Sequence, residues 1–381
     1  LLLFAGALVC HGEMVKLRPA PRYLTQFYLV VALGGALGGV FVNFVAPVLF
    51  DSTWELPLSV IMAWVAIAAA QMLDRTSPLY NRLRVPMTVI LGVALVLSIF
   101  AFSEEVRRFR VSTLTATRNF YGVLRVQKVD RSPGDVYRLV HGTTIHGVQY
   151  VEPARRSSPI GYFSPSSGIG MHLERITARE AHLRVGVLGL GAGTLAAYGR
   201  PGDVYRFYEI DPQVIDYARG QGDYFSYLAE SPAEIDLIVG DARLSLEREL
   251  QRGDPQGYDV LILDVFSGDA VPVHLLTREA FTVYLDHLQA DGVLAANIST
   301  SHLNMRPLLA VLADHFGLEG IVVEDEGDDA MRYASFWVLM ARDRGLLSGD
   351  VIEEGVDLAS FHDPEMQLWT DTYSNLLPLL R

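Results

Sequence analysis

The chain has 381 residues, of which 50% are hydrophobic, and it carries a formal net charge of −13 at pH 7. A chain of this length can form more than one domain, each with its own core. The acidic balance argues against a nucleic-acid-binding protein, because such a protein needs a basic face to displace counterions from phosphates. The single cysteine, Cys10, cannot form an internal disulfide or a cysteine-rich metal site.

The N-terminal third is predicted to be a set of transmembrane helices. The chain opens in an apolar run, Leu1–Val9, without a methionine, so we expect a fragment of a longer membrane protein. A signal peptide is the alternative, although no basic region precedes the run. Tyr23–Phe50, Leu56–Leu73 and Val85–Phe102 are three expected spans, since each is apolar and long enough. Small residues at Gly34–Gly39 favour close helix packing there over a phosphate loop.

Two further patterns follow the spans. Between Asn119 and Val151, period-two alternation broken by Ser132–Gly134 and by Gly142 predicts a small antiparallel sheet, with His141 and His146 as hairpin residues. From Arg184 onward, buried-looking strands alternate with amphipathic helices, which predicts a parallel sheet covered on both faces. The acidic stretch Glu324–Asp329 is interpreted as a solvated loop.

The fold class is therefore α/β: a Rossmann-like, doubly wound sheet preceded by a small antiparallel β lobe and by transmembrane helices. The expected strands of the large sheet are Val185–Leu190, Val204–Glu209, Ile235–Val239, Asp259–Leu263, Gly292–Asn297 and Phe336–Ala341. The expected parts are residues 1–110 (transmembrane), 118–165 (β lobe), 180–345 (nucleoside-binding domain) and 346–381 (C-terminal extension).

A glycine-rich turn follows the first strand of the large sheet. Gly189, Gly191 and Gly193 lie where a side chain would hold a ligand away from the backbone and from a helix N-terminus. The next strand ends at Glu209, about twenty residues on, where an acid can accept hydrogen bonds from both ribose hydroxyls of a nucleoside. The structural alternative for Glu209 is an acid that caps the helix opened by Pro212.

Two more acids follow strand ends. Asp241 lies just beyond the third strand, where its carboxylate could accept a hydrogen bond from an adenine amino group; an ordinary helix N-cap is the alternative. Asp264 ends the fourth strand, over the crevice in which open α/β sheets hold their ligands; a turn carboxylate is the alternative. Four strand ends with suitable residues in one order are hard to obtain by chance, so we predict a nucleoside site.

These residues resemble the spermidine synthase family of aminopropyltransferases, and more closely its membrane-fused bacterial branch, over about Tyr121 to Ala341. The resemblance implies that Gln149 contacts the nucleoside and that Tyr162 belongs to the acceptor pocket. It implies that Asp264 is the base that takes a proton from the attacking amine. It also implies three roles in cofactor binding: the glycine-rich loop receives the cofactor, Glu209 binds its ribose, and Asp241 binds its adenine.

The resemblance also implies the partners. The co-substrate would be decarboxylated S-adenosylmethionine or S-adenosylmethionine, without a metal, and the acceptor a putrescine-like amine. The lipid bilayer would be the other partner, nucleic acid would not be one, and a homodimer is allowed. We expect a multi-pass protein of the bacterial inner membrane.

Two positions depart from the family pattern. The aspartate that the family carries inside its glycine loop is Ala192 here, and the second acid of the catalytic loop, Asp269, comes two residues later than in the family's Asp-x-x-Asp-Pro. A doubly charged diamine needs a carboxylate for each ammonium group, because an unpaired ammonium is costly to desolvate. Asp264, Asp269 and Tyr162 are the residues expected to hold the amine.

The function predicted from the sequence is a membrane-anchored, spermidine synthase-like aminopropyl transfer, which the pair Asp264 and Asp269 favours. Ala192 favours two alternatives: a methyltransferase with the same cofactor pocket, or a non-catalytic domain that senses a nucleoside or polyamine for a membrane transporter. The sequence gives contradictory signals for the orientation of the spans in the membrane, because basic residues lie at both ends of the predicted helices. We expect the transferase domain in the cytoplasm, since the adenosyl cofactor is made there.

Overall fold

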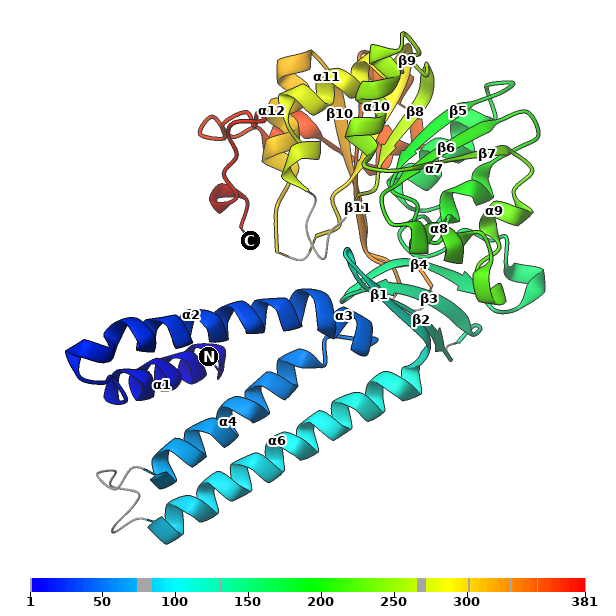
Figure 1. Cartoon of the computed structure of the whole chain (residues 1–381). Coiled ribbons are helices and arrows are strands. Elements are labelled where there is room, and N and C mark those ends of the chain that lie inside the picture. Colours follow the sequence, from blue (N-terminus) through cyan, green and yellow to red (C-terminus); the bar gives the residue numbers. More distant parts are fainter. Residues whose placement is uncertain are drawn as a thin grey trace. The chain divides into compact units, whose positions relative to one another are not determined.

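The computed structural model describes residues 2–73, 84–130, 132–265, 272–300, 302–328, 331–347 and 349–380. The chain forms two compact units, Leu1–Val123 and Leu124–Arg381. The first is helical and the second is α/β (Figure 1).

Apolar helices make up most of the first unit. Their bounds are α1 (Leu2–Lys16), α2 (Leu24–Val40), α3 (Ala46–Leu49), α4 (Glu55–Leu73) and α6 (Arg84–Ser112), followed by strand β1 (Thr113–Asn119). A π-helical turn, Phe41–Val45, joins α2 to α3. As a result Pro21–Leu49 runs as a single helix of 29 residues, and among the described residues it is the one helix long and apolar enough to cross a membrane.

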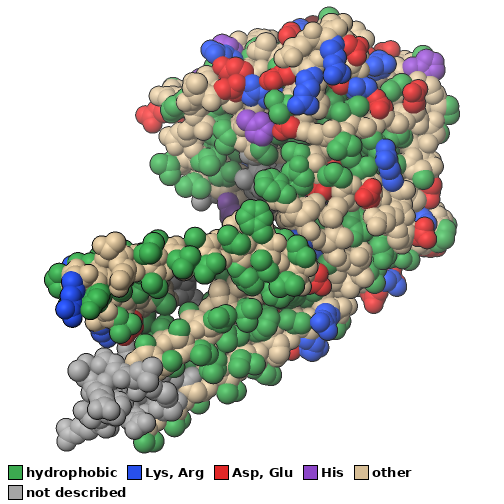
Figure 2. Space-filling view, in the orientation of Figure 1, with side chains coloured by type: hydrophobic (Ala, Val, Ile, Leu, Met, Phe, Trp, Pro, Cys, Tyr) green, Lys and Arg blue, Asp and Glu red, His purple; other side chains and the backbone are tan. Residues whose placement is uncertain are grey.

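Large apolar side chains cover the outside of this unit. Leu29, Leu37 and Val48 are 67%, 60% and 83% exposed, and Figure 2 shows hydrophobic side chains along the helices of the unit. The long helix coincides with the first predicted span. The segment of the second predicted span is a shorter apolar helix, Glu55–Ala70, and the third lies on α6. Their membrane crossing remains a prediction.

The second unit begins with a small antiparallel sheet. Strand β2 (Gly122–Val129) contains the boundary between the units and pairs with β3 (Val136–His141), which pairs with β4 (Thr144–Tyr150). Because His141 ends β3 and His146 lies in β4, the prediction that both are hairpin residues is confirmed.

An eight-stranded sheet forms the body of the second unit, in the order β12-β10-β11-β9-β8-β5-β6-β7. The bounds are β5 (Arg184–Leu188), β6 (Val204–Glu209), β7 (Glu234–Val239), β8 (Tyr258–Leu263), β9 (Leu288–Asn297), β10 (Glu319–Asp325), β11 (Ser335–Ala341) and β12 (Val356–Asp357). Five strands, β9-β8-β5-β6-β7, pair in parallel. The chain leaves β5 toward β6 on one side and returns to β8 on the other, which opens a crevice at the carboxyl ends of β5 and β8.

The predicted parallel pairing is confirmed for these five strands but is wrong for β11, the predicted final strand. Strand β11 pairs antiparallel with both β9 and β10, and β12 pairs antiparallel with β10. The physical reason is the short connection between β10 and β11, since parallel neighbours need a crossover of a dozen or more residues. The predicted class, a Rossmann-like methyltransferase-type α/β fold, is confirmed.

Alternate residues of each strand face opposite sides of the sheet, which explains the near-continuous apolar strand sequences. Val187 belongs to one core cluster and Leu188 to the other. The first cluster includes residues of α7 (Gly168–Thr177), α8 (Pro212–Ala218), α9 (Tyr227–Glu230) and α13 (Gly349–Glu354). The second includes residues of α10 (Ala242–Gln251), α11 (Arg278–His287) and α12 (Arg306–Phe316). Helices therefore cover both faces (Figure 1).

The C-terminal segment packs on the second cluster. Trp369 and Leu379 are fully buried there, and the backbone N–H of Arg278 donates to the carbonyl of Trp369. This hydrogen bond holds the C-terminal segment against α11.

Candidate functional site

The glycine turn after β5 lies tightly against two other segments. Gly189, Gly191 and Gly193 have φ angles of 95°, 54° and 81°, which favour glycine. A Cβ on Gly189 would lie 2.2 Å from the carbonyl oxygen of Asp264, and one on Gly191 would lie 2.1 Å from that of His146. The turn therefore brings together the ends of β5 and β8 and the β3–β4 hairpin.

Ala192, at the position of the family's loop aspartate, is a packing residue. It is 1% exposed, and its backbone N–H donates to the carbonyl of His146 at 3.2 Å. A Cβ on Gly147 would lie 2.4 Å from the Cβ of Ala192. The side chain at 192 thus fills the contact between the loop and strand β4.

Glu209 ends β6 and braces the glycine turn. Its carboxylate accepts hydrogen bonds from the backbone N–H of Leu190, at 3.1 Å, and of Asp211, at 2.9 Å. Helix α8 is capped by Asp211, whose carboxylate accepts from the N–H of Gln213 at 2.9 Å. The capping alternative for Glu209 is therefore wrong. Burial raises the pKa of Glu209 to about 7.

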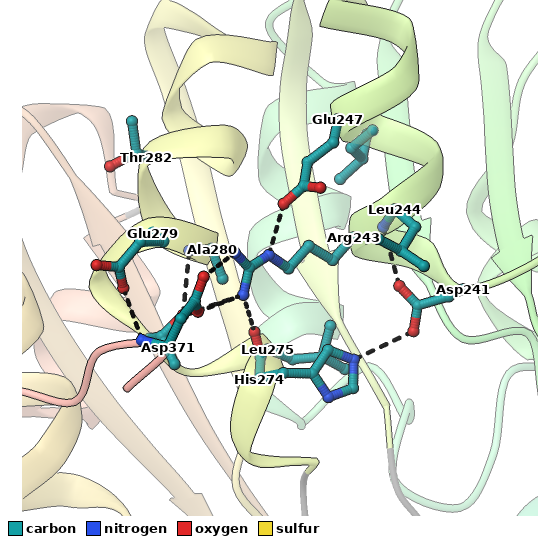
Figure 3. Close-up of polar contacts among 12 residues, drawn as sticks. Asp241, Arg243, Leu244, Glu247, His274, Leu275, Glu279, Ala280, Thr282 and Asp371 are labelled. Carbon is teal, nitrogen blue, oxygen red and sulfur yellow. Dashed lines mark hydrogen bonds and ion pairs between the residues drawn. The ribbon is translucent and has the colours of Figure 1, made fainter. Parts of the chain in front are cut away.

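Asp241 caps the N-terminus of helix α10, which is the structural role given above as the alternative to adenine binding. One carboxylate oxygen accepts from the backbone N–H of Leu244 at 2.9 Å, and the other lies 3.1 Å from Nε2 of His274 (Figure 3). A carboxylate has about four acceptor positions, so capping leaves capacity for a ligand. Two apolar side chains beside these acids are exposed, Ile210 by 41% and Leu244 by 48%. Such side chains can cover the faces of a base.

Arg243, next to Asp241, ties the C-terminal segment to the same region. Its guanidinium donates two hydrogen bonds to Asp371, at 2.7 and 2.6 Å, one to the carbonyl of His274 and one to Glu247 (Figure 3). These bonds hold the pKa of Asp371 below its usual range. A pocket of about 810 Å³ lies here, and its lining includes Asp241, His274 and residues 370–374. The sequence analysis did not anticipate this contribution of the C-terminal segment.

Asp264 lies in a second, smaller cavity of about 310 Å³. The cavity is lined by Thr143, Thr144, Ile145, His146, Tyr162, Phe163, Asp264, Asn297, Ser299 and His302. The carboxylate of Asp264 accepts a hydrogen bond from Nδ2 of Asn297 at 2.8 Å. Burial raises the pKa of Asp264 to about 6, while the Asn297 bond opposes that shift. The structure thus brings together Asp264 and Tyr162, two residues predicted for the acceptor pocket.

Two other residues were predicted for the site, Asp269 and Gln149. Asp269 falls outside the described residues. Gln149 is fully buried, with its amide engaged by the protein: it donates to the carbonyl of Arg156 and to the hydroxyl of Ser226, and it accepts from the N–H of Ser226. Gln149 therefore joins β4 to the segment before α9, and its predicted nucleoside contact stays a prediction.

The cavity also contains residues that the sequence analysis missed. His146 was interpreted only as a hairpin residue, yet it lines the cavity, and its Nε2 is buried without a hydrogen-bond partner among the described residues. Burial lowers the pKa of His146 to about 4, so its ring is neutral at pH 7. Asn297 and Ser299 are two others, and one signal could have found them, because a polar residue ends the predicted strand there. No group of three metal-ligating side chains occurs among the residues that the structure describes.

Comparison with known proteins gives partial matches. No family model matches the chain. It is 36% identical over 124 residues to a polyamine aminopropyltransferase of Vibrio vulnificus, which covers 32% of this chain and 39% of the relative. It is 38% identical over 112 residues to an N-terminal histidine N-methyltransferase of Emericella nidulans, covering 29% of this chain and 19% of the relative. The matches therefore span well under half of either relative.

Among solved structures, the chain is similar to a probable spermidine synthase from Corynebacterium glutamicum. The TM-score is 0.43 at 21% sequence identity, covering 60% of this chain and 79% of that chain. The sequence match over 124 residues relates part of this chain to a polyamine aminopropyltransferase. The relationship is compatible with a transferase.

Proposed function

We propose that this protein is a membrane-anchored, spermidine synthase-like transferase that passes an aminopropyl group from decarboxylated S-adenosylmethionine to an amine. The observation that carries the proposal is the carboxylate of Asp264, which lies in a cavity with Tyr162 and is oriented by Asn297. The backbone of the same residue contacts the glycine turn. The sequence match to a polyamine aminopropyltransferase supports the same assignment.

The residues around the glycine turn fit the nucleoside part of such a donor. Glu209 would accept hydrogen bonds from the ribose hydroxyls, and Asp241 would accept one from the adenine amino group. Exposed Ile210 and Leu244 would cover the base. The turn itself would admit the sulfonium end of the donor, because its glycines carry no side chain that could hold a ligand away.

The chemical step needs a base and little else. The acceptor nitrogen attacks the propyl carbon bound to the sulfonium; a C–N bond forms, the C–S bond breaks, and its electron pair goes to sulfur, which leaves methylthioadenosine. The acceptor nitrogen must attack as a neutral amine, so Asp264 takes the proton that it sheds. A carboxyl with a pKa near 6 is largely ionised at neutral pH and suits this task. Orientation of the two substrates supplies much of the rate.

Product analysis tests this proposal. Purified protein is incubated with putrescine and decarboxylated S-adenosylmethionine, and we expect methylthioadenosine. Asp264→Asn should lower turnover by about a hundredfold or more, since general-base catalysis is worth on the order of 10² to 10⁴, while nucleoside affinity stays unchanged. Full activity of Asp264→Asn would remove this residue as the base.

A methyltransferase is the second candidate, favoured by Ala192. The loop position that carries an aspartate in the aminopropyltransferases holds a buried methyl group here, and one sequence relative is an N-methyltransferase. In the same experiment, S-adenosylmethionine would then yield S-adenosylhomocysteine. Nucleoside binding without either product would instead support a sensing domain.

The proposal includes a bilayer anchor. The helix Pro21–Leu49 has 29 residues, and at about 1.5 Å per residue such a length exceeds the roughly 30 Å of hydrocarbon in a membrane. Apolar side chains on its outside would contact lipid. We place the transferase unit in the cytoplasm of a bacterium, at the inner membrane, because its adenosyl donor is made there.

A further inference from the structure

Asn297 links Asp264 to the neighbouring strand through a chain of hydrogen bonds. Asn297 is the last residue of β9 and is 4% exposed. Its Nδ2 lies 2.8 Å from Oδ1 of Asp264. Its Oδ1 lies 3.0 Å from the backbone nitrogen and 2.5 Å from the hydroxyl of Ser299. The Ser299 hydroxyl in turn lies 2.9 Å from the backbone nitrogen of Phe336, in β11.

The direction of this chain follows from its two backbone donors. A backbone N–H can only donate, so the N–H of Phe336 donates to the Ser299 hydroxyl, and the N–H of Ser299 requires an acceptor on Asn297. The amide oxygen of Asn297 must therefore point to Ser299. The hydroxyl of Ser299 donates its hydrogen to the same oxygen. The amide nitrogen then points to Asp264, and it can only donate.

We infer that Asn297 and Ser299 are positioning residues for Asp264: their one-way hydrogen-bond chain keeps Oδ1 of Asp264 an acceptor and leaves Oδ2 to take the proton of the substrate amine. This inference rests on the proposed function for the identity of the substrate. The geometry itself does not depend on it. The carboxylate is held in the same orientation before and after proton transfer, because protonation on Oδ2 leaves the Asn297 bond intact.

The same chain favours the ionised form of Asp264. The cavity removes the carboxyl from water, which raises its pKa, and the hydrogen bond from Asn297 counteracts that effect. The other titratable groups lining the cavity, among the described residues, are His146 on the hairpin, Tyr162, and His302 after β9. His146 is neutral at pH 7. Asn297 is thus the group best placed to stabilise the charge of Asp264.

Titration of Asp264 in the full-length protein tests the inference without any turnover. The carboxyl band is followed by infrared difference spectroscopy against pH, with Asp264→Asn as the reference that lacks it. We expect Asn297→Leu, which is similar in size but cannot donate, to raise the Asp264 pKa by about one unit. Ser299→Ala should raise it less, because the backbone N–H of Ser299 still orients the amide. Thr143→Ala removes a hydroxyl that lines the cavity but does not belong to the hydrogen-bond chain. This variant should leave the titration of Asp264 unchanged.

Activity gives the second measurement. The acid limb of the pH profile of kcat should move upward with the Asp264 pKa in Asn297→Leu, while nucleoside affinity stays unchanged. An unaltered Asp264 titration in both Asn297→Leu and Ser299→Ala overturns the positioning role, even if the protein forms methylthioadenosine. A shifted titration in a protein that forms no transfer product supports the positioning role and contradicts the proposed function.

Discussion

In the second unit, burial raises the pKa of Glu209 to about 7 and that of Asp264 to about 6. Burial is the main cause for both, but their surroundings differ. Glu209 accepts from two backbone N–H groups of the loops beside it, whereas Asp264 accepts from a side chain in a cavity. A ligand that donates hydrogen bonds to either group therefore binds best when that group is ionised.

The proposed ribose contact of Glu209 predicts that nucleoside affinity depends on pH. Its acid form predominates below about pH 7, and the ribose hydroxyls donate to the ionised form. We expect methylthioadenosine affinity to increase as pH rises, with a change of about tenfold per unit below the pKa and a plateau above it. Glu209→Gln should bind about tenfold more weakly at pH 8 and lose this dependence. Isothermal calorimetry across that range is the measurement, and an unchanged profile in Glu209→Gln would contradict the ribose role.

Sequence reasoning identified candidate site residues at the ends of β6, β7 and β8, and it missed Asn297 at the end of β9 as well as the hairpin residue His146. Glu209, Asp241 and Asp264 were found because the carboxyl ends of parallel strands share one edge of the sheet. His146 could not be assigned, since nothing in a hairpin pattern shows which other loop it approaches. Its place in the cavity follows from the contact of its carbonyl with Gly191, far along the chain.

At the scale of elements, regular apolar patterns were predictable and mixed ones were not. The strands β5, β6, β7, β8 and β9 lie where the sequence analysis expected them. Strand β10 was missed because it ends in the acids Glu324 and Asp325, which were interpreted as part of a loop. The structure explains their presence in a strand: Glu324 pairs with Arg306, and Asp325 accepts from the hydroxyl of Ser166 at 2.6 Å.

The C-terminal segment is an element whose attachment can be tested at one residue. Arg243→Ala removes both bonds to Asp371, and we expect proteolysis of residues 363–380 to accelerate by about five- to thirtyfold, the effect of roughly 1–2 kcal/mol. The partly exposed setting of Asp371 keeps the expected value low.

Arg248→Ala is the matched control, because Arg248 is an exposed arginine on the same helix, α10, as Arg243. Limited proteolysis with mass spectrometry measures the rate. Equal cleavage of Arg243→Ala and the wild-type protein would show that the Arg243 bonds do not hold the segment.

At the scale of the whole molecule, the two units differ in the surface that they expose. The first unit presents apolar helices, whereas many charged side chains lie on the visible surface of the second (Figure 2). A chain with such helices is expected in a bilayer, since contiguous apolar surface of this extent is rare on soluble proteins. This contrast supports the proposal of a membrane anchor in the first unit and a transferase in the second.

We expect the wild-type protein to stay in the membrane pellet when the membranes are washed with alkaline carbonate. Leu33→Lys combined with Leu37→Lys should release a large fraction of the protein, because a charge at the centre of a span costs about 2.5–3.5 kcal/mol. Tyr23→Lys is the control, since a lysine at a helix end can reach the interface. Immunoblots of pellet and supernatant measure the partition. Full release of the wild-type protein by the wash would contradict the anchor.

The contact between Ala192 and Gly147 has a consequence for how this site can change. Gly147 leaves no room for a side chain, because a Cβ there would lie 2.4 Å from the Cβ of Ala192. The hairpin that contains Gly147 also carries His146 into the acceptor cavity. A side chain larger than glycine at position 147 must therefore displace the loop or the hairpin, and with the hairpin the part of the Asp264 cavity wall that His146 forms.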